Sequence, residues 1–195
     1  MEEIKITSNC KVVIIGGSAG SLNALMQILP ELIKINDFAL VIVLHRKSTD
    51  DQTLEDLITL KSNIKVKSVE DKVPLLPGFI YIAPSNYHLL FEKDGILALD
   101  TSEKINYSRP SIDVSFESAA EVYGSSLIGM LLSGSNSDGT VGLRAIKEAG
   151  GITVAQNPLS AEMPFMPNNA ILYSNPDYIL NIEEILHFIA SINME

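Results

Sequence analysis

The sequence is poor in cysteine, has no tryptophan and contains no apolar run of membrane-spanning length. Its one cysteine, Cys10, excludes an internal disulfide and a cysteine-cluster metal site, and we interpret it as a thiol without a functional role. The apolar stretch FALVIVL at residues 38–44 is strand-sized, well short of the roughly 20 residues of a membrane helix. The acidic start MEEIKITSNCKV does not fit a signal peptide. We therefore expect a cytoplasmic protein without membrane insertion.

Positive charge is also scarce: 14 Lys and Arg face 24 Asp and Glu, giving a net charge of -10. This balance does not favour nucleic-acid binding, and an anionic partner would need a local basic patch. With 46% apolar residues, the composition is that of a folded globular chain rather than a disordered one. The sequence shows no repeat, linker or low-complexity tract, so we expect a single domain over residues 1–195.

The chain alternates short apolar runs with segments of helical period. Strands covered on both faces are predicted at residues 12–15, 38–44, 125–132 and 151–155. Apolar residues recur every three or four positions over 22–29 and 185–192, as on amphipathic helices. The segment 77–100 shows no such period and predicts an antiparallel hairpin at one sheet edge. The fold class expected is α/β, a doubly wound, mostly parallel sheet with helices on both faces.

A glycine-rich turn stands between the first strand and the first helix, in VVIIGGSAGSLNALMQIL at residues 12–29. It is no dinucleotide fingerprint, because Ser18 stands where a glycine must admit the pyrophosphate, and no Gly-Lys-Ser/Thr follows as in a P-loop. It does match G-x-S-x-G, the nucleophile elbow, with Ser18 at its centre. The alternative is an ordinary helix cap, since serine is a preferred N-cap residue.

A serine nucleophile needs a base and a group that orients the base. Of the three histidines, His45 ends a predicted parallel strand, whereas His88 lies in the hairpin segment and His187 on the outer face of the last helix. Asp138 follows another strand, in SGSNSDGTVGL. Open α/β sheets gather their sites at the carboxyl ends of strands, so Ser18, His45 and Asp138 are predicted to meet. Ordinary loop roles stay open: a satisfied histidine, and an Asx turn or N-cap for the aspartate.

Six sequence blocks together resemble the catalytic domain of the chemotaxis protein-glutamate methylesterase family. In chain order they are IGGSAGS, VLHRKS, LLPGFIYIAPSNYH, RPSIDVSFESAA, LLSGSNSDGTVGL and AGGITVAQNPLSAEMPFMPNNAI, and they span about residues 10–181. The resemblance implies a doubly wound fold and a triad at Ser18, His45 and Asp138. It also implies hydrolysis of glutamate methyl esters on the cytoplasmic helices of methylated chemoreceptors, and deamidation of receptor glutamine. Arg109 and Met166, the latter followed by Pro167, fall in blocks that line the family's cleft.

The oxyanion of this reaction would be held by backbone N–H groups around Ala19 and Gly20 and by the loop at residues 133–139. Two departures from the family pattern bear on the rate. Ala19 stands where threonine is common, and Ser135 where methionine is common. If the threonine hydroxyl assists the oxyanion, turnover should be slower here unless Ser135 replaces it.

Partners and regulation follow from the same resemblance. A receiver domain usually precedes this domain, but only about ten residues precede the first predicted strand here, so a separate receiver or regulatory protein is one expectation. An acidic receptor helix would be repelled unless Arg46, Lys47 and Arg109 form a positive rim. No cofactor or metal is expected. Two alternatives remain open: a weakly active or inactive receptor-binding or scaffold domain of a sensory pathway, and a small-molecule esterase.

Overall fold

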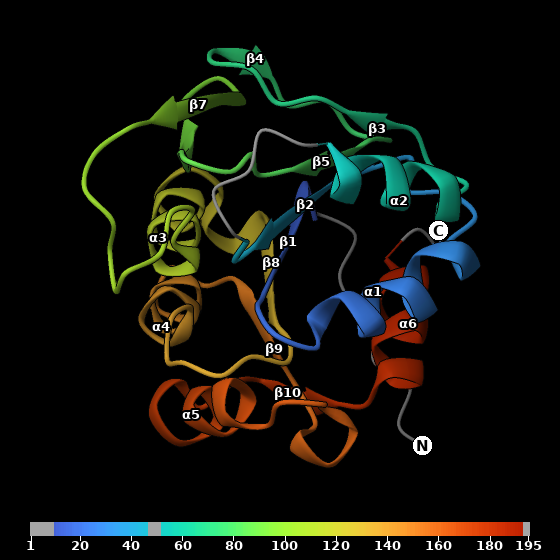
Figure 1. Ribbon diagram of the computed structural model, residues 1–195, viewed down its shortest axis with the longest axis vertical. Helices are drawn as coiled ribbons and strands as arrows, with labels where there is room; N and C mark the ends of the chain where they lie inside the picture. Colours follow the sequence, from blue (N-terminus) through green and yellow to red (C-terminus); the bar gives the residue numbers. More distant parts are fainter. Residues whose placement is uncertain (1–9, 47–51, 193–195) are drawn as a thin grey trace.

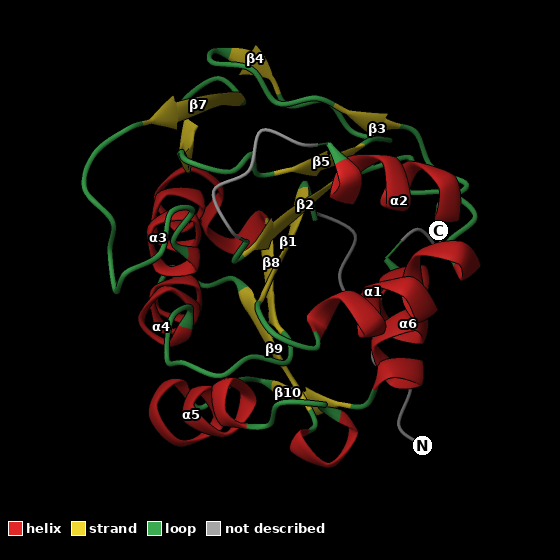
Figure 2. Ribbon diagram, viewed as in Figure 1, coloured by secondary structure: helices red, strands yellow, loops and turns green. Residues whose placement is uncertain are grey.

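The computed structural model describes residues 10–46 and 52–192 and contains a large sheet between two layers of helices and a small sheet at one edge of the molecule (Figures 1 and 2). The larger sheet has seven strands in the order β10-β9-β8-β1-β2-β5-β3, all parallel, and the smaller has three in the order β4-β7-β6. The strands of the large sheet are β1 (Val12–Gly17), β2 (Ala39–Leu44), β3 (Val66–Lys67), β5 (Ile80–Ile82), β8 (Leu127–Leu131), β9 (Ile152–Gln156) and β10 (Tyr178–Leu180). The helices are α1 (Ser21–Ile28), α2 (Thr53–Lys61), α3 (Ile112–Tyr123), α4 (Thr140–Glu148), α5 (Phe165–Ser174) and α6 (Ile182–Ser191), with short 3-10 turns at Leu29–Glu31, Gly124–Ser126 and Pro158–Ser160.

The large sheet is doubly wound, as the sequence predicts. Strand β1 lies at its centre; β2 is added on one side and β8 on the other, so the chain reverses its direction of winding at β1. In consequence α1, α2 and α6 cover one face and α3, α4 and α5 cover the other (Figure 1). Such a reversal point is where open α/β sheets form a crevice at the carboxyl ends of their strands.

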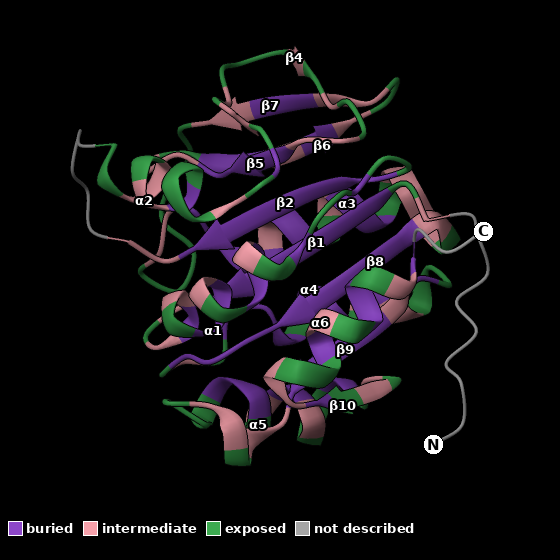
Figure 3. Cartoon of the chain, turned by 90° about the vertical axis from the view of Figure 1, so that its right-hand side faces the viewer, coloured by how far each residue is buried: buried purple, intermediate pink, exposed green. Residues whose placement is uncertain are grey.

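The core consists of two apolar layers, one on each face of the large sheet. Successive side chains of a strand point to opposite faces, so Val13 and Ile15 join the layer under α1 and α6, while Val12 and Ile14 join the layer under α3 and α4. Strands β1, β2 and β8 are buried along their whole length (Figure 3). The continuous apolar runs in the sequence therefore reflect burial on both faces.

The segment 77–100 differs in part from its prediction. The hairpin is confirmed: β6 (His88–Glu92) pairs antiparallel with β7 (Ile96–Asp100). It forms a separate sheet with β4 (Val73–Pro74), packed against α3. The preceding run FIYIA was wrongly assigned to this excursion, because β5 inserts between β2 and β3 and pairs parallel with both. Three apolar residues are too few to distinguish a parallel from an antiparallel strand.

Among the helices of the described segments, none has the length and apolar character needed to cross a bilayer. The last helix, α6, instead presents one apolar side to the sheet and begins with a capping box formed by Asn181 and Glu184. His187 is exposed on the outer side of this helix, as the apolar spacing predicts.

Candidate active site

Three neighbouring strands bring the predicted triad residues to one edge of the sheet. The register pairs Gly17 of β1 with Leu44 of β2, so the residues that follow, Ser18 and His45, are neighbours across the two strand ends. The His45 N–H donates to the Gly17 carbonyl over 3.1 Å. On the other side of β1, the Ser18 N–H donates to the Ser133 carbonyl over 2.9 Å, which ties the turn to the loop that follows β8.

The turn after β1 contains two N–H groups and a serine hydroxyl that have no partner among the described residues. Gly20 adopts a left-handed conformation with φ 82° and precedes α1, and no side chain caps this helix. The Ser18 carbonyl is bound by the Ser21 N–H at 3.1 Å and the Ser21 hydroxyl at 2.5 Å. Within residues 10–46 and 52–192, neither the Ser18 hydroxyl nor the N–H of Ala19 or Gly20 has a hydrogen-bond partner. Ser18 therefore does not cap α1, and its surroundings provide free donors for an anion.

His45 is held through both ring nitrogens. Its Nε2 lies 2.6 Å from Oδ2 of Asp138, and its Nδ1 lies 3.3 Å from the side-chain amide of Asn136. The Asn136 oxygen accepts the Asp138 N–H over 3.1 Å, which fixes the orientation of the Asn136 amide. With Nε2–H donating to the carboxylate, Nδ1 is the basic nitrogen of the neutral ring, and its lone pair accepts a hydrogen bond from the Asn136 amide.

Asp138 is buried and saturated with hydrogen-bond donors. Besides His45, its carboxylate accepts from the N–H of Ile112 (2.7 Å), the hydroxyl of Ser111 (3.0 Å), the N–H of Asp113 (3.0 Å) and the N–H of Gly139 (3.1 Å). Burial alone would raise the pKa of Asp138, but the hydrogen bonds from His45 and the backbone lower it below its usual value. The carboxylate also lies at the N-terminus of α3, where a negative charge is favoured. It is thus ionised at neutral pH, orients the imidazole and anchors a helix.

A second layer of polar groups supports Asp138, and sequence reasoning missed it. Nδ1 of buried His88 accepts the Ser111 N–H over 3.1 Å, and its Nε2 pairs with the Glu103 carbonyl at 3.0 Å. The Asp113 carboxyl accepts the Gly142 N–H over 2.7 Å at the start of α4. Burial, with a contribution from the Asp138 charge, raises the pKa of Asp113 to about 7. The sequence block RPSID, residues 109–113, contains Ser111 and Asp113 of this layer, but the prediction from sequence used only its arginine, Arg109.

Hydrogen bonds of Ser133 and the buried side chain of Met166 hold the loop after β8 in place. Ser133 donates its hydroxyl to the Ala19 carbonyl over 2.8 Å, and its N–H donates to Gln156 over 2.9 Å. Met166 is fully buried, and its sulfur and terminal methyl pack so closely on Gly134 that a Cβ there would lie 2.5–2.6 Å from them. Met166 therefore lies beneath the loop rather than on its surface. Ser135 is exposed on the loop, and its side chain has no hydrogen bond within the described segments.

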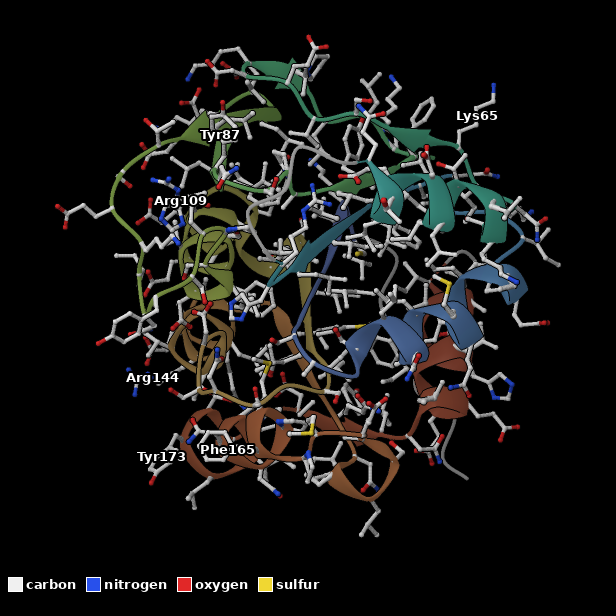
Figure 4. The ribbon with its side chains drawn as sticks, in the orientation of Figure 1. Lys65, Tyr87, Arg109, Arg144, Phe165 and Tyr173 are labelled. Atoms are coloured by element: carbon white, nitrogen blue, oxygen red, sulfur yellow. The ribbon has the colours of Figure 1, made fainter. Side chains whose placement is uncertain are left out.

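Two positive side chains, Arg46 and Arg109, lie close to His45. Arg46 pairs with Glu55 at 2.8 Å. Arg109 is half-buried, and one terminal nitrogen donates to the carbonyls of Thr101 (2.7 Å) and Ser102 (2.6 Å); it belongs to the loop that leads into α3 (Figure 4). The third residue of the predicted rim, Lys47, lies outside the described residues.

Neither the thiol nor the acidic side chains form a metal centre in the part of the chain that the structure describes. No group of three or more His, Cys, Asp or Glu there is arranged to hold a metal ion. Burial raises the pKa of Cys10 to about 12, although its contact with the Val12 carbonyl acts in the opposite direction. A thiol with this pKa is a poor nucleophile at neutral pH. The chemistry available at the strand ends is therefore that of a serine, an imidazole and a buried carboxylate.

The sequence and the fold of this chain are similar to those of known proteins. The model of the CheB methylesterase family matches residues 13–189. A relative from Leptospira interrogans, named provisionally as a protein-glutamate methylesterase/protein-glutamine glutaminase, is 46% identical over 91% of this chain and 92% of its own length. A longer one from Carboxydothermus hydrogenoformans, named protein-glutamate methylesterase/protein-glutamine glutaminase 1, is 37% identical over 93% of this chain and 55% of its own. The crystal structure of the Thermotoga maritima CheB methylesterase catalytic domain superposes with a TM-score of 0.86 at 33% identity, covering 92% of this chain and 97% of that one.

Proposed function

The chain belongs to the CheB methylesterase family, and from that premise we propose that it hydrolyses γ-methyl esters of glutamate on the cytoplasmic helices of chemoreceptors. Removal of ammonia from receptor glutamine is the second reaction proposed, since the names of the relatives pair the two activities. Both are acyl transfers from a glutamyl side chain to water. They differ only in the leaving group, methanol or ammonia.

The observation that carries this proposal is the 2.6 Å hydrogen bond between His45 and Asp138 near Ser18, whose hydroxyl has no partner among the described residues. Ser18 Oγ attacks the ester carbonyl while Nδ1 of His45 takes its proton, and the imidazolium then returns the proton to departing methanol. Asp138 holds the ring in this tautomer and stabilises the imidazolium. A water molecule, activated by the same nitrogen, releases the glutamate and restores the serine.

The oxyanion is proposed to be bound at the serine turn. The N–H groups of Ala19 and Gly20, unpaired within the described segments, lie at the N-terminus of α1. Each such donor is worth roughly 3 kcal/mol of transition-state stabilisation in comparable sites. Ala19 contributes only its backbone, because its methyl group cannot donate. The exposed hydroxyl of Ser135, on the loop after β8, is the substitute that we propose. Met166 acts in this scheme as a support of that loop.

Methanol release from methylated receptor tests the proposal. The native chain should release methanol, and Ser18→Ala should abolish release without lowering the free energy of unfolding, because the Ser18 hydroxyl makes no hydrogen bond in the described segments. Ser125→Ala is the matched control: this serine is exposed, precedes β8 and so lies at the opposite edge of the sheet. Equal release by Ser18→Ala and the native chain would refute the assignment of the nucleophile.

A further inference from the structure

A small cavity opens beside His45 and is walled by positive side chains. Its volume is about 70 Å³, and Arg46, Lys104 and Arg109 line it together with His45 and Tyr107. We propose that this cavity binds the carboxylate of an acidic side chain located one helical turn from the esterified glutamate of the substrate helix. The proposal rests on the proposed function, because it assumes that the substrate is a helix presented to Ser18.

The charge balance of the cavity favours an anion. Arg46 already has a partner in Glu55, but within residues 10–46 and 52–192 neither Lys104 nor Arg109 contacts a carboxylate. Arg109 is instead held by two backbone carbonyls, which fix its guanidinium without neutralising it. Two cations without a carboxylate partner face one small space in a chain of net charge -10. An anionic group entering this space would form charge-assisted hydrogen bonds.

The size of the cavity selects the kind of anion. One water molecule needs about 10–15 Å³ on this measure, so 70 Å³ has room for a carboxylate and its remaining water. The bound group is therefore expected to be the end of an Asp or Glu side chain.

The position of the cavity explains why the acidic side chain should come from the substrate itself. His45 lines the cavity and also bears the nitrogen that serves Ser18, so the two sites are adjacent. On a helix, residues three or four apart have Cβ atoms about 5–6 Å from each other. A helix that presents its ester to Ser18 can therefore place a neighbouring carboxylate in the cavity. The cavity would then select esters that have an acidic neighbour.

The lip of the cavity is a tight turn that presents an aromatic ring. Ile105 and Ser108 exchange both backbone hydrogen bonds, and the two residues between them, Asn106 and Tyr107, have φ of 49° and 65°. This is the conformation of a type I′ turn, which bulky residues adopt only at a cost. Tyr107 is nevertheless 97% exposed, so its ring is not held there by packing. We assign the ring to contact with the substrate helix.

Two helical peptides that differ in one property test the subsite. Each has a single glutamate methyl ester; one has Glu and the other Gln at the four positions three and four residues away. Binding is measured by fluorescence anisotropy with Ser18→Ala chain, so that the result does not depend on turnover. The Glu peptide should bind about tenfold more tightly at low salt, and the preference should fall to about threefold in chain that also has Lys104→Gln.

The matched control is Lys93→Gln in the same background. Lys93 is exposed at the β6–β7 turn, whose residues Asp94 and Gly95 border a separate cavity with Val12 and Ala39, the first residues of β1 and β2. This substitution removes the same charge at the opposite edge of the sheet and should leave the tenfold preference unchanged. Equal affinity for the two peptides, or an undiminished preference in Lys104→Gln, would overturn the subsite. Methanol release by the native chain tests the esterase activity separately, so either proposal can fail alone.

Discussion

The side-chain amide of Asn136 lies 3.3 Å from Nδ1 of His45, opposite the ring nitrogen that binds Asp138. The two partners are of opposite kinds, because the carboxylate can only accept a hydrogen bond and the amide nitrogen can only donate one. Together they leave one tautomer for the neutral ring, with the proton on Nε2 and the lone pair on Nδ1. The base nitrogen of the proposed reaction is thus defined by two residues of a single loop.

Asn136→Ala should lower kcat/KM for receptor demethylation about fivefold, the effect of one hydrogen bond worth about 1 kcal/mol. The ring would lose one of its two anchors, and the Asp138 N–H would lose its acceptor. Because Asn136 touches the base, the change should appear in kcat more than in KM. An increase in kcat would contradict this expectation. It would show that the Asn136 amide blocks Nδ1 of His45, the nitrogen that Ser18 needs, and so slows the reaction.

Asp138→Asn should impair both folding and catalysis. An amide can replace one oxygen of the carboxylate, but it turns an NH₂ group toward backbone N–H donors that need an acceptor, and we expect a loss of about 2–3 kcal/mol in the free energy of unfolding. Activity should fall roughly 10³–10⁴-fold in the variant that remains folded, since the imidazole loses its orienting anion. Urea unfolding and methanol release measure the two effects. Stability equal to that of Ser18→Ala would contradict the anchoring role of Asp138.

The positions of Ser18, His45 and Asp138 were predictable because each follows a continuous apolar run. Such runs identify buried parallel strands, and the carboxyl ends of neighbouring parallel strands share one edge. The glycines around Ser18 are local signals of a sharp turn. These features are encoded within about ten residues of each site residue, so they can be read without knowing the fold.

The supporting contacts were not predictable in the same way. Ser111 and Asp138 are 27 positions apart, and Asn136 and His45 are 91 apart, so no spacing rule relates them. The two-residue strands β3 and β4 are too short to show any period. Met166 illustrates a further difficulty, since an apolar residue in a cleft-lining block can lie beneath a loop instead of on it.

Asp113→Asn should stabilise the protein at alkaline pH. The folded-state pKa of Asp113 is raised to about 7 from 3.8, chiefly by burial, so the folded state holds the proton more tightly than the unfolded state. The free energy of unfolding therefore falls as pH rises between these two values, and it stops falling on account of Asp113 above about pH 7. Asparagine keeps the acceptor for the Gly142 N–H but cannot ionise.

The variant should thus be more stable than the native chain at about pH 8, and the difference should shrink toward about pH 4. Urea unfolding at a series of pH values measures it. Asp138 contributes little to the pH dependence of the free energy of unfolding above about pH 5. Its lowered pKa keeps it ionised in the folded state, and an unfolded aspartate is ionised there as well. A difference between the two chains that does not change with pH would show that Asp113 is ionised throughout.

Two substitutions of Tyr107 separate the cost of its backbone from the use of its ring. Tyr107→Gly and Tyr107→Ala both remove the ring, but only glycine adopts a φ of 65° without strain, so the glycine variant should be more stable than the alanine variant by about 1 kcal/mol. Both should lose affinity for the substrate helix to the same extent, because the ring is 97% exposed and its absence is common to them. Thermal unfolding and peptide anisotropy give the two quantities. If affinity followed stability, with the glycine variant binding as the native chain does, the turn rather than the ring would be what the substrate requires. If both variants bound normally, Tyr107 would have no part in recognition, and the strained turn would serve only to place Lys104 and Arg109 on either side of the cavity.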